Sequence, residues 1–246
     1  EKNTLIVNAP PGAGKSTLLP LTLIDEPWLN GQKIIMLEPR RLAARTIAER
    51  MAYFLGEKVG ETVGYRIRFD NRVSEQTKIE VVTEGILTRM IQSDNELSGI
   101  AMVIFDEFHE RSLNADLGLA LCREIAGALR DDLMLLVMSA TLDAEPVATL
   151  MDDAPMVTSA GRSYPVETRW LEKPLRKEDR LEDATARLIE KAVSETQGGV
   201  LVFLPGEGEI RRTAQRLKLP NDCHVHTLFG AMDFKAQRAA IQPAET

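Results

Sequence analysis

The chain has 246 residues, of which 44% are hydrophobic and 27% charged, so it can bury a substantial core and bulk disorder is not expected. Its formal net charge of −7 argues against a protein that holds nucleic acid through bulk positive charge, but it does not exclude a local cationic channel. The two cysteines, Cys122 and Cys223, lie far apart, which indicates no disulfide framework and favours a reducing cytoplasm. No apolar run reaches the roughly 18–20 residues that would span a bilayer, so no membrane segment is expected.

Short apolar runs alternate with longer amphipathic runs along the first part of the chain. The short runs that predict buried strands are residues 4–8, 33–37, 78–82, 101–105 and 133–138. Four helices are predicted between them. The first begins near residue 15, the second ends near residue 55, the third begins at residue 84, and the fourth spans about 114–129. A further strand over residues 63–68 is expected at an edge. Strands that are apolar on both faces and alternate with helices predict an α/β fold with a parallel sheet covered on both sides.

The pattern changes after residue 160, which predicts a division of the chain. The stretch GRSYPVETRWL at 161–171 contains a proline and alternates polar with apolar residues, so residues 161–175 are expected to form an extended connector. Residues 176–246 begin a second α/β series that has too few strands for a complete domain. Its predicted elements are helices over 181–196, after 208 and from about 234, and strands over 200–204 and 224–228. We therefore expect one domain over residues 1–160 and an incomplete second one over 176–246. Because the chain also begins without a methionine, we expect it to be a fragment of a longer protein.

A glycine-bearing stretch, APPGAGKST over residues 9–17, lies between the first predicted strand and helix, as a phosphate-binding loop must. Backbone N–H groups can surround an anion there, Lys15 can reach the β and γ phosphates, and the Ser16 hydroxyl can ligate Mg²⁺. Ala9 stands where the strict pattern has glycine, and an ordinary strand-to-helix turn is the alternative. The residues predicted to hold the nucleotide are Gly12, Ala13, Gly14, Lys15, Ser16 and Thr17.

Two carboxylates, Asp106 and Glu107, follow the predicted strand over 101–105. They would therefore emerge at the carboxyl end of the strand, where ligands bind in parallel sheets. Asp106 can hold Mg²⁺ through its water shell, and Glu107 can orient and deprotonate an attacking water. The alternative is that Asp106 caps the next segment and Glu107 is solvated. The phosphate loop upstream favours a catalytic pair that works together with Lys15.

These stretches occur with others in an order that resembles the superfamily 2 helicases. GKST at 14–17 resembles their motif I and DEFH at 106–109 their motif II. EPRRLAA at 38–44, TEGIL at 83–87 and SAT at 139–141 resemble motifs Ia, Ib and III. VGYRIRFD, DEFHERSL and FLPG resemble the DEAH/RHA group, and DEFH in place of DEAH resembles a bacterial branch of it. The resemblance covers nearly the whole chain, and the ordered set is far more specific than any one motif.

The resemblance implies a RecA-like P-loop domain that binds ATP and Mg²⁺, followed by part of a second RecA-like domain. It implies a monomer that acts on single-stranded RNA, with Arg40 and Thr83 contacting phosphates of the strand. Arg50 matches an arginine that stacks on adenine, but Ile241 stands where relatives have the aromatic partner, so weak base discrimination is expected. The residues implied to couple the ATP state to domain movement are His109, Ser139 and Thr141.

Several alternatives stay open at this point. Arg40 could belong to a solvated helix start, and Ser139 and Thr141 to a plain turn with a cap. The chain could be a nucleotide-gated nucleic-acid binding or scaffold module that unwinds no duplex. It could also act on DNA, because phosphate contacts are possible with either backbone. The arginine fingers of the family would lie beyond Thr246, so we expect this fragment to bind nucleotide but hydrolyse it slowly.

Overall fold

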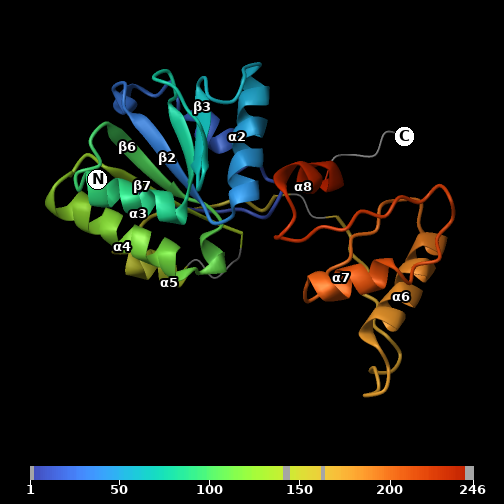
Figure 1. Cartoon of the computed structure of the whole chain (residues 1–246). Coiled ribbons are helices and arrows are strands. Elements are labelled where there is room, and N and C mark those ends of the chain that lie inside the picture. The colour runs from blue at the N-terminus through green and yellow to red at the C-terminus, as the bar shows by residue number, and fades with distance from the viewer. Residues whose placement is uncertain (1–2, 141–144, 162–163, 242–246) are drawn as a thin grey trace. The chain divides into compact units, whose positions relative to one another are not determined.

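The structure, a computed structural model, describes residues 3–140, 145–161 and 164–241 (Figure 1). The chain divides into two compact units, residues 1–165 and residues 166–246. The predicted assignment of a first domain, a connector over 161–175 and a partial second domain stays a prediction. Among the described helices, none is long and apolar enough to cross a membrane.

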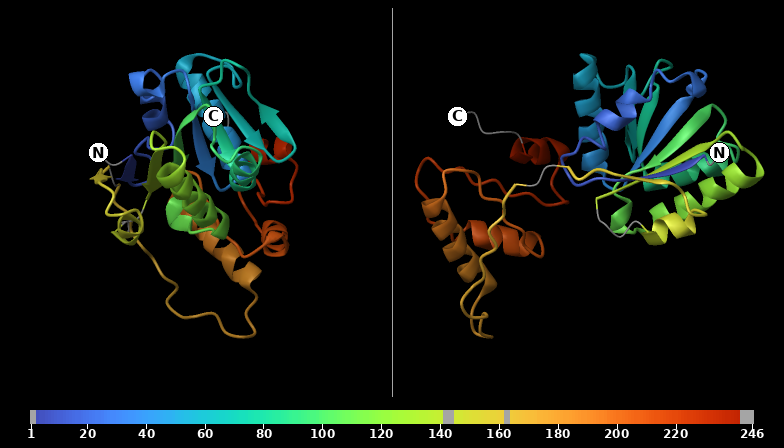
Figure 2. Two further views of the ribbon diagram at one scale, coloured as in Figure 1. Left: turned by 90° about the vertical axis from the view of Figure 1, so that its left-hand side faces the viewer. Right: turned by 180° about the vertical axis from the view of Figure 1, so that it is seen from behind.

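An eight-stranded sheet forms the centre of the first unit, in the order β4-β3-β5-β2-β6-β7-β1-β8. Every neighbouring pair is parallel except β3 and β4, which form an antiparallel hairpin, and the sheet is twisted (Figure 2). The strands are β1 (Thr4–Asn8), β2 (Lys33–Glu38), β3 (Val63–Ile67), β4 (Asp70–Arg72), β5 (Ile79–Thr83), β6 (Ile100–Phe105), β7 (Met134–Ser139) and β8 (Met156–Thr158). The predicted parallel α/β sheet is therefore confirmed.

Helices cover both faces of this sheet (Figure 1). They are α1 (Leu18–Thr22), α2 (Arg41–Leu55), α3 (Glu84–Ser93), α4 (Leu113–Ala128) and α5 (Glu145–Leu150), with 3-10 turns at Pro27–Leu29 and Phe108–Glu110. Strand β2 shows why both faces are apolar: Ile34 and Met36 pack in the core under α2, whereas Ile35 and Leu37 pack in the core under α3 and α4. Alternate residues of a strand point to opposite faces of the sheet. A strand that is covered on both faces is therefore apolar at successive positions.

Some boundaries differ from the predictions. The helix after the phosphate loop begins at Leu18, three residues later than expected, and Pro20 lies within its first turn, where a missing N–H costs nothing. Strand β3 is not the edge strand, because β4 pairs outside it. β4 and β8 have three residues each and α5 has six, and such short elements leave little periodic signal in a sequence.

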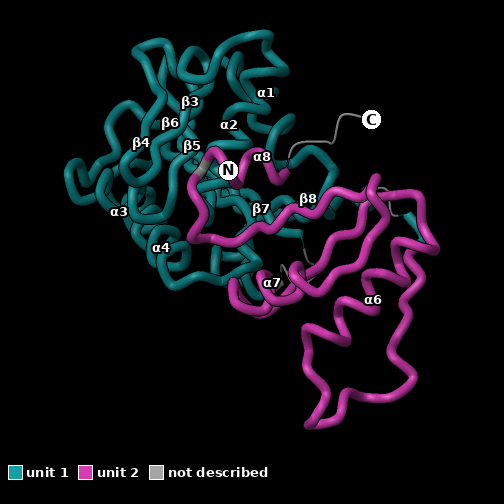
Figure 3. Tube along the Cα trace, turned by 45° about the vertical axis from the view of Figure 1, so that its right-hand side comes forward, with its two compact units in different colours: residues 1–165 teal, residues 166–246 magenta. Residues whose placement is uncertain are grey.

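The second unit is helical in the residues that the structure describes (Figure 3). It contains α6 (Leu181–Glu195), α7 (Glu207–Ala214) and α8 (Phe234–Ile241). Arg212 joins α7 to Glu182 of α6 at 2.6 Å. The strands predicted over 200–204 and 224–228 are wrong for this structure, and Leu201 and Phe203 are 78% and 87% exposed. A strand needs a neighbour for its backbone hydrogen bonds, and the described residues of this unit supply none.

Candidate active site

The phosphate loop has the backbone that its glycines predict. Gly12 and Gly14 have φ values of 80° and 82°, in the left-handed region that favours glycine. A Cβ built on Gly14 would lie 3.1 Å from Leu18 Cδ1, so a side chain there would press on the start of α1. The N–H of Ala9 donates to the carbonyl of Ser139 at 3.0 Å, which ties the loop to the end of β7. The loop is thus held at the carboxyl edge of the sheet, with the Lys15 side chain 5% exposed.

Asp106 lies next to this loop, although 90 residues of sequence separate it from Ser16. The N–H of Glu107 donates to Asp106 Oδ1 at 2.8 Å, and Ser16 lies close enough to lower the pKa of Asp106. Burial raises the pKa of Asp106 above its usual 3.8, and the Ser16 contact opposes that rise. Asp106 Oδ2 is buried and has no hydrogen-bond partner among the described residues. A buried, unpartnered carboxylate oxygen beside a hydroxyl is a donor set that suits Mg²⁺.

Glu107 connects the loop to the segment that follows β6. Its Oε1 lies 3.4 Å from Lys15 Nζ, and its Oε2 lies 3.3 Å from His109 Nε2. Its φ of 49° is left-handed, which is uncommon for a residue other than glycine and often marks a functional position. The Glu107 side chain thus meets the phosphate loop, as expected from the sequence, but the sequence pattern did not predict the left-handed backbone at this residue.

His109 extends this contact to the end of β7. The N–H of Ala140 donates to His109 Nδ1 at 3.3 Å, so the ring proton lies on Nε2, which faces Glu107. Ser139 is buried at the carboxyl end of β7. Thr141, the third predicted coupling residue, lies outside the described residues. Three stretches distant in sequence thus meet through the side chains of Lys15, Glu107 and His109.

Glu38 belongs to this site but was not predicted as a functional residue. It ends β2, is 2% exposed, and its Oε2 has no hydrogen-bond partner among the described residues. Burial, followed by the charges of Asp106, Glu107 and Glu110, raises the pKa of Glu38 to about 9. Glu38 is therefore protonated at neutral pH. Its sequence signal was the same as that of Asp106, a carboxylate at the end of an apolar strand.

The remaining predicted residues lie near this edge or along α2. Arg40 precedes α2, and its Nη2 lies 2.9 Å from Glu110 Oε1. Thr83 is buried at the end of β5 and pairs with Glu38 across the sheet. Arg50 lies on α2 with its guanidinium 4.7 Å from the ring centroid of Phe54. The predicted contacts of these three residues with nucleic acid or adenine stay predictions.

The first strand of this parallel sheet ends in a phosphate loop, and a lysine and a serine of the loop face carboxylates at the end of another strand. This arrangement defines a RecA-like P-loop domain. Residues 1–150 match the family described as DEAD/DEAH box helicase, and the chain belongs to this family. Membership confirms the resemblance that the ordered motifs indicated.

Individual relatives agree with this assignment. The chain is 53% identical over 242 residues to the ATP-dependent RNA helicase HrpB of Escherichia coli, which covers 98% of the chain and 30% of that protein. It is 36% identical to the HrpA homolog of Haemophilus influenzae, over 99% of the chain and 19% of that protein. The crystal structure of the E. coli DEAH/RHA helicase HrpB matches 99% of the chain and 31% of that structure, with a TM-score of 0.91 and 51% identity. The chain thus spans less than a third of the length of these relatives.

Proposed function

We propose that the chain is the nucleotide-binding part of an ATP-dependent RNA helicase. The observation that carries the proposal is the contact series from Lys15 through Glu107 and His109 to the backbone of Ala140. These contacts join the candidate phosphate-binding lysine, the candidate base and the candidate coupling histidine, which supports assigning them to one site. An ordinary strand-to-helix turn has no need of such a connection.

In this proposal the loop over residues 12–17 surrounds the phosphates of ATP with backbone N–H groups, and Lys15 contacts the β and γ phosphates. The Ser16 hydroxyl and the Asp106 carboxylate, the latter through water, would hold Mg²⁺, which when bound neutralises charge on those phosphates. The lowering effect of Ser16 on the pKa of Asp106 and the unpartnered Asp106 Oδ2 support this pair. Among the described residues no group of three or more His, Cys, Asp or Glu side chains gathers, so in this proposal phosphates and water supply the remaining ligands of the ion.

Glu107 is the proposed general base. It accepts a proton from the attacking water while an oxygen–phosphorus bond forms at the γ phosphorus and the bond to the β-phosphate oxygen breaks. In the described state Lys15 and His109 each lie beside one of its carboxylate oxygens. When ATP occupies the loop, Lys15 would turn to the phosphates and leave Glu107 for the water.

Coupling to the strand is proposed to start at His109. Because its Nδ1 accepts from Ala140, a shift of Glu107 during hydrolysis would move the backbone directly after Ser139 at the end of β7. Thr141 follows in the sequence and is proposed to take part in the coupling with Ser139. Arg40 and Thr83 are proposed to contact phosphates of single-stranded RNA, and Arg50 to contact adenine. The ion pair between Arg40 and Glu110 would then exchange for a phosphate.

The longer protein is proposed to act in the cytoplasm as a monomer, and the chain alone is proposed to hydrolyse ATP slowly, since it spans 30% of the E. coli HrpB and 19% of the H. influenzae HrpA homolog. The test is phosphate release by the chain and by the longer protein, titrated with single-stranded RNA and DNA. We expect RNA-stimulated turnover and duplex unwinding by the longer protein. Stimulation without unwinding would indicate the nucleotide-gated module, and stimulation by DNA alone would indicate a DNA-directed enzyme.

A further inference from the structure

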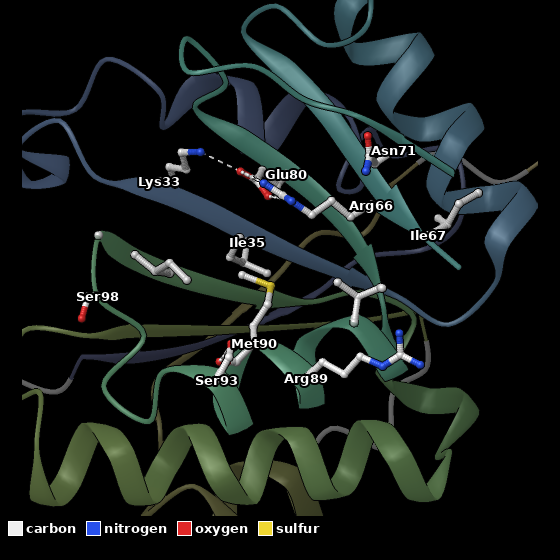
Figure 4. Close-up of a pocket in the computed structure, with 13 residues that line it drawn as sticks. Lys33, Ile35, Arg66, Ile67, Asn71, Glu80, Arg89, Met90, Ser93 and Ser98 are labelled. Atoms are coloured by element: carbon white, nitrogen blue, oxygen red, sulfur yellow. Dashed lines mark hydrogen bonds and ion pairs between the residues drawn. The ribbon is translucent and has the colours of Figure 1, made fainter. Parts of the chain in front are cut away.

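A groove lies between α3 and the face of the sheet formed by β2, β5 and β3 (Figure 4). Its volume is about 660 Å³, within the range of pockets that hold ligands. The residues that shape it include Lys33, Ile35, Arg66, Glu80, Arg89 and Met90. Helix α2 packs in the core on the opposite face of the sheet, so the groove is bounded by α3 on this face.

The groove is separate from the nucleotide site. Lys33 and Ile100 begin β2 and β6, so the groove reaches the amino edge of the sheet. The phosphate loop, Asp106 and Glu107 lie at the carboxyl edge. None of the residues assigned above to ATP, Mg²⁺ or RNA lines the groove.

The single carboxylate among the described lining residues is already neutralised. Glu80 accepts from Lys33 Nζ at 2.7 Å and from Arg66 Nε at 2.6 Å. Burial raises its pKa, but the hydrogen bonds from Arg66 and Lys33 outweigh burial and hold the pKa below 4.5. Glu80 thus holds the side chains of Lys33 and Arg66 in place, and both of its carboxylate oxygens already accept hydrogen bonds from them.

Arg89 is the third cation. It is exposed on α3, and the described residues give it no hydrogen bond or ion pair. Figure 4 shows Arg89 at the opposite end of the groove from Lys33, with Ile35 and Met90 between them. Three cations against one satisfied carboxylate make this groove positive, on a chain whose net charge is −7.

We propose that this groove binds an acidic peptide segment of a partner protein, in which an apolar residue is flanked by carboxylates. The apolar residue would pack on Ile35 and Met90, and the carboxylates would pair with Arg89 at one end and Lys33 at the other. Nucleic acid fits less well, because the described lining residues include no aromatic ring on which a base could stack.

The experiment follows backbone amide chemical shifts of the isotope-labelled 246-residue chain during titration with the peptide EELEE. The peptide KKLKK is the charge-reversed probe, and oligouridylate is the nucleic-acid probe. We expect EELEE to shift the amides of Ser98, Gly99 and Ile67, which line the groove, and KKLKK to leave them unchanged. An equal response to KKLKK, or no response to EELEE, contradicts the proposal, and larger shifts of the same amides with oligouridylate would make the groove a nucleic-acid site instead.

Variants assign the response to the groove. Arg89→Glu should weaken EELEE binding roughly fivefold or more, because it turns one attraction into a repulsion. Arg187→Glu, an exposed arginine of α6, makes the same charge change elsewhere and should have no effect. If Arg89→Glu disturbs the spectrum of the free chain, Ser98→Glu introduces a negative charge at the Lys33 end of the groove. Unchanged affinity in the folded variant overturns the proposal.

Discussion

The N–H of Ala140 donates to His109 Nδ1 at 3.3 Å, so the segment after β6 and the end of β7 are joined by one imidazole. The other ring nitrogen faces Glu107 at 3.3 Å. A movement of Glu107 would therefore displace the His109 ring and, through it, the backbone of Ala140.

Replacing His109 with alanine should leave ATP binding intact while RNA-stimulated turnover of the longer protein falls roughly tenfold, about 1.4 kcal/mol of barrier. The reason is that Glu107 loses one of its two fixed neighbours and Ala140 loses its acceptor. The measurement is phosphate release with and without RNA. His226→Ala, an exposed histidine of the second unit, is the matched control, and equal stimulation in both variants would remove His109 from the coupling role.

Changing Glu107 to glutamine keeps the shape of the side chain but removes its basicity. In the longer protein, turnover should fall by about 10²–10⁴, the usual contribution of a general base, with ATP affinity little changed. Single-turnover hydrolysis separates this chemical step from product release. Glu75→Gln, on an exposed segment, should behave like the parent protein. Turnover that survives in Glu107→Gln would show that another group takes the proton.

Lys15→Ala should weaken ATP binding about 10–100-fold, because a buried charge-assisted contact to phosphate is lost. Calorimetry on the chain measures this directly and does not depend on turnover. Lys58→Ala changes an exposed lysine and serves as the control. Unchanged affinity in Lys15→Ala is incompatible with the phosphate role.

Glu38 makes stability depend on pH. Its pKa in the folded chain is about 9, against an ordinary value of 4.5. Between these values the folded chain holds a proton that the unfolded chain has released, so this group lowers stability progressively as pH rises from about 4.5 to 9. Glu38→Gln should remove that dependence, and be more stable than the parent chain by on the order of 2–4 kcal/mol at pH 8, with little difference near pH 4.5.

Urea unfolding of the first unit measures this effect. Fluorescence of Trp28 reports on that unit when Trp170, which lies in the second unit, is replaced by phenylalanine. Glu124→Gln, an exposed glutamate on α4, is the control and should show no such pH dependence. If parent and Glu38→Gln curves differ equally at both pH values, Glu38 is not protonated in the folded chain.

The central strands β2, β5, β6 and β7 were predictable because they are apolar on both faces, whereas the short strands β4 and β8 lack that pattern and were not predicted. Residues 101–105, for instance, all lie within β6, and all are buried. The strands predicted over 200–204 and 224–228 had similar apolar runs but did not form. An apolar run gives a segment a propensity to form a strand. Backbone hydrogen bonds to a neighbouring strand decide whether the strand forms.

The sequence by itself determined the chemical groups of this protein: a glycine-bearing phosphate loop, a pair of carboxylates after a buried strand, and the ordered motifs of its family. The tertiary structure alone decided how those groups meet. It set the left-handed backbone of Glu107, the contact of His109 with Ala140, and the burial of Glu38 among other acids. These features depend on the order of strands in the sheet, which brings residues far apart in the chain to one edge, and no local pattern encodes that order.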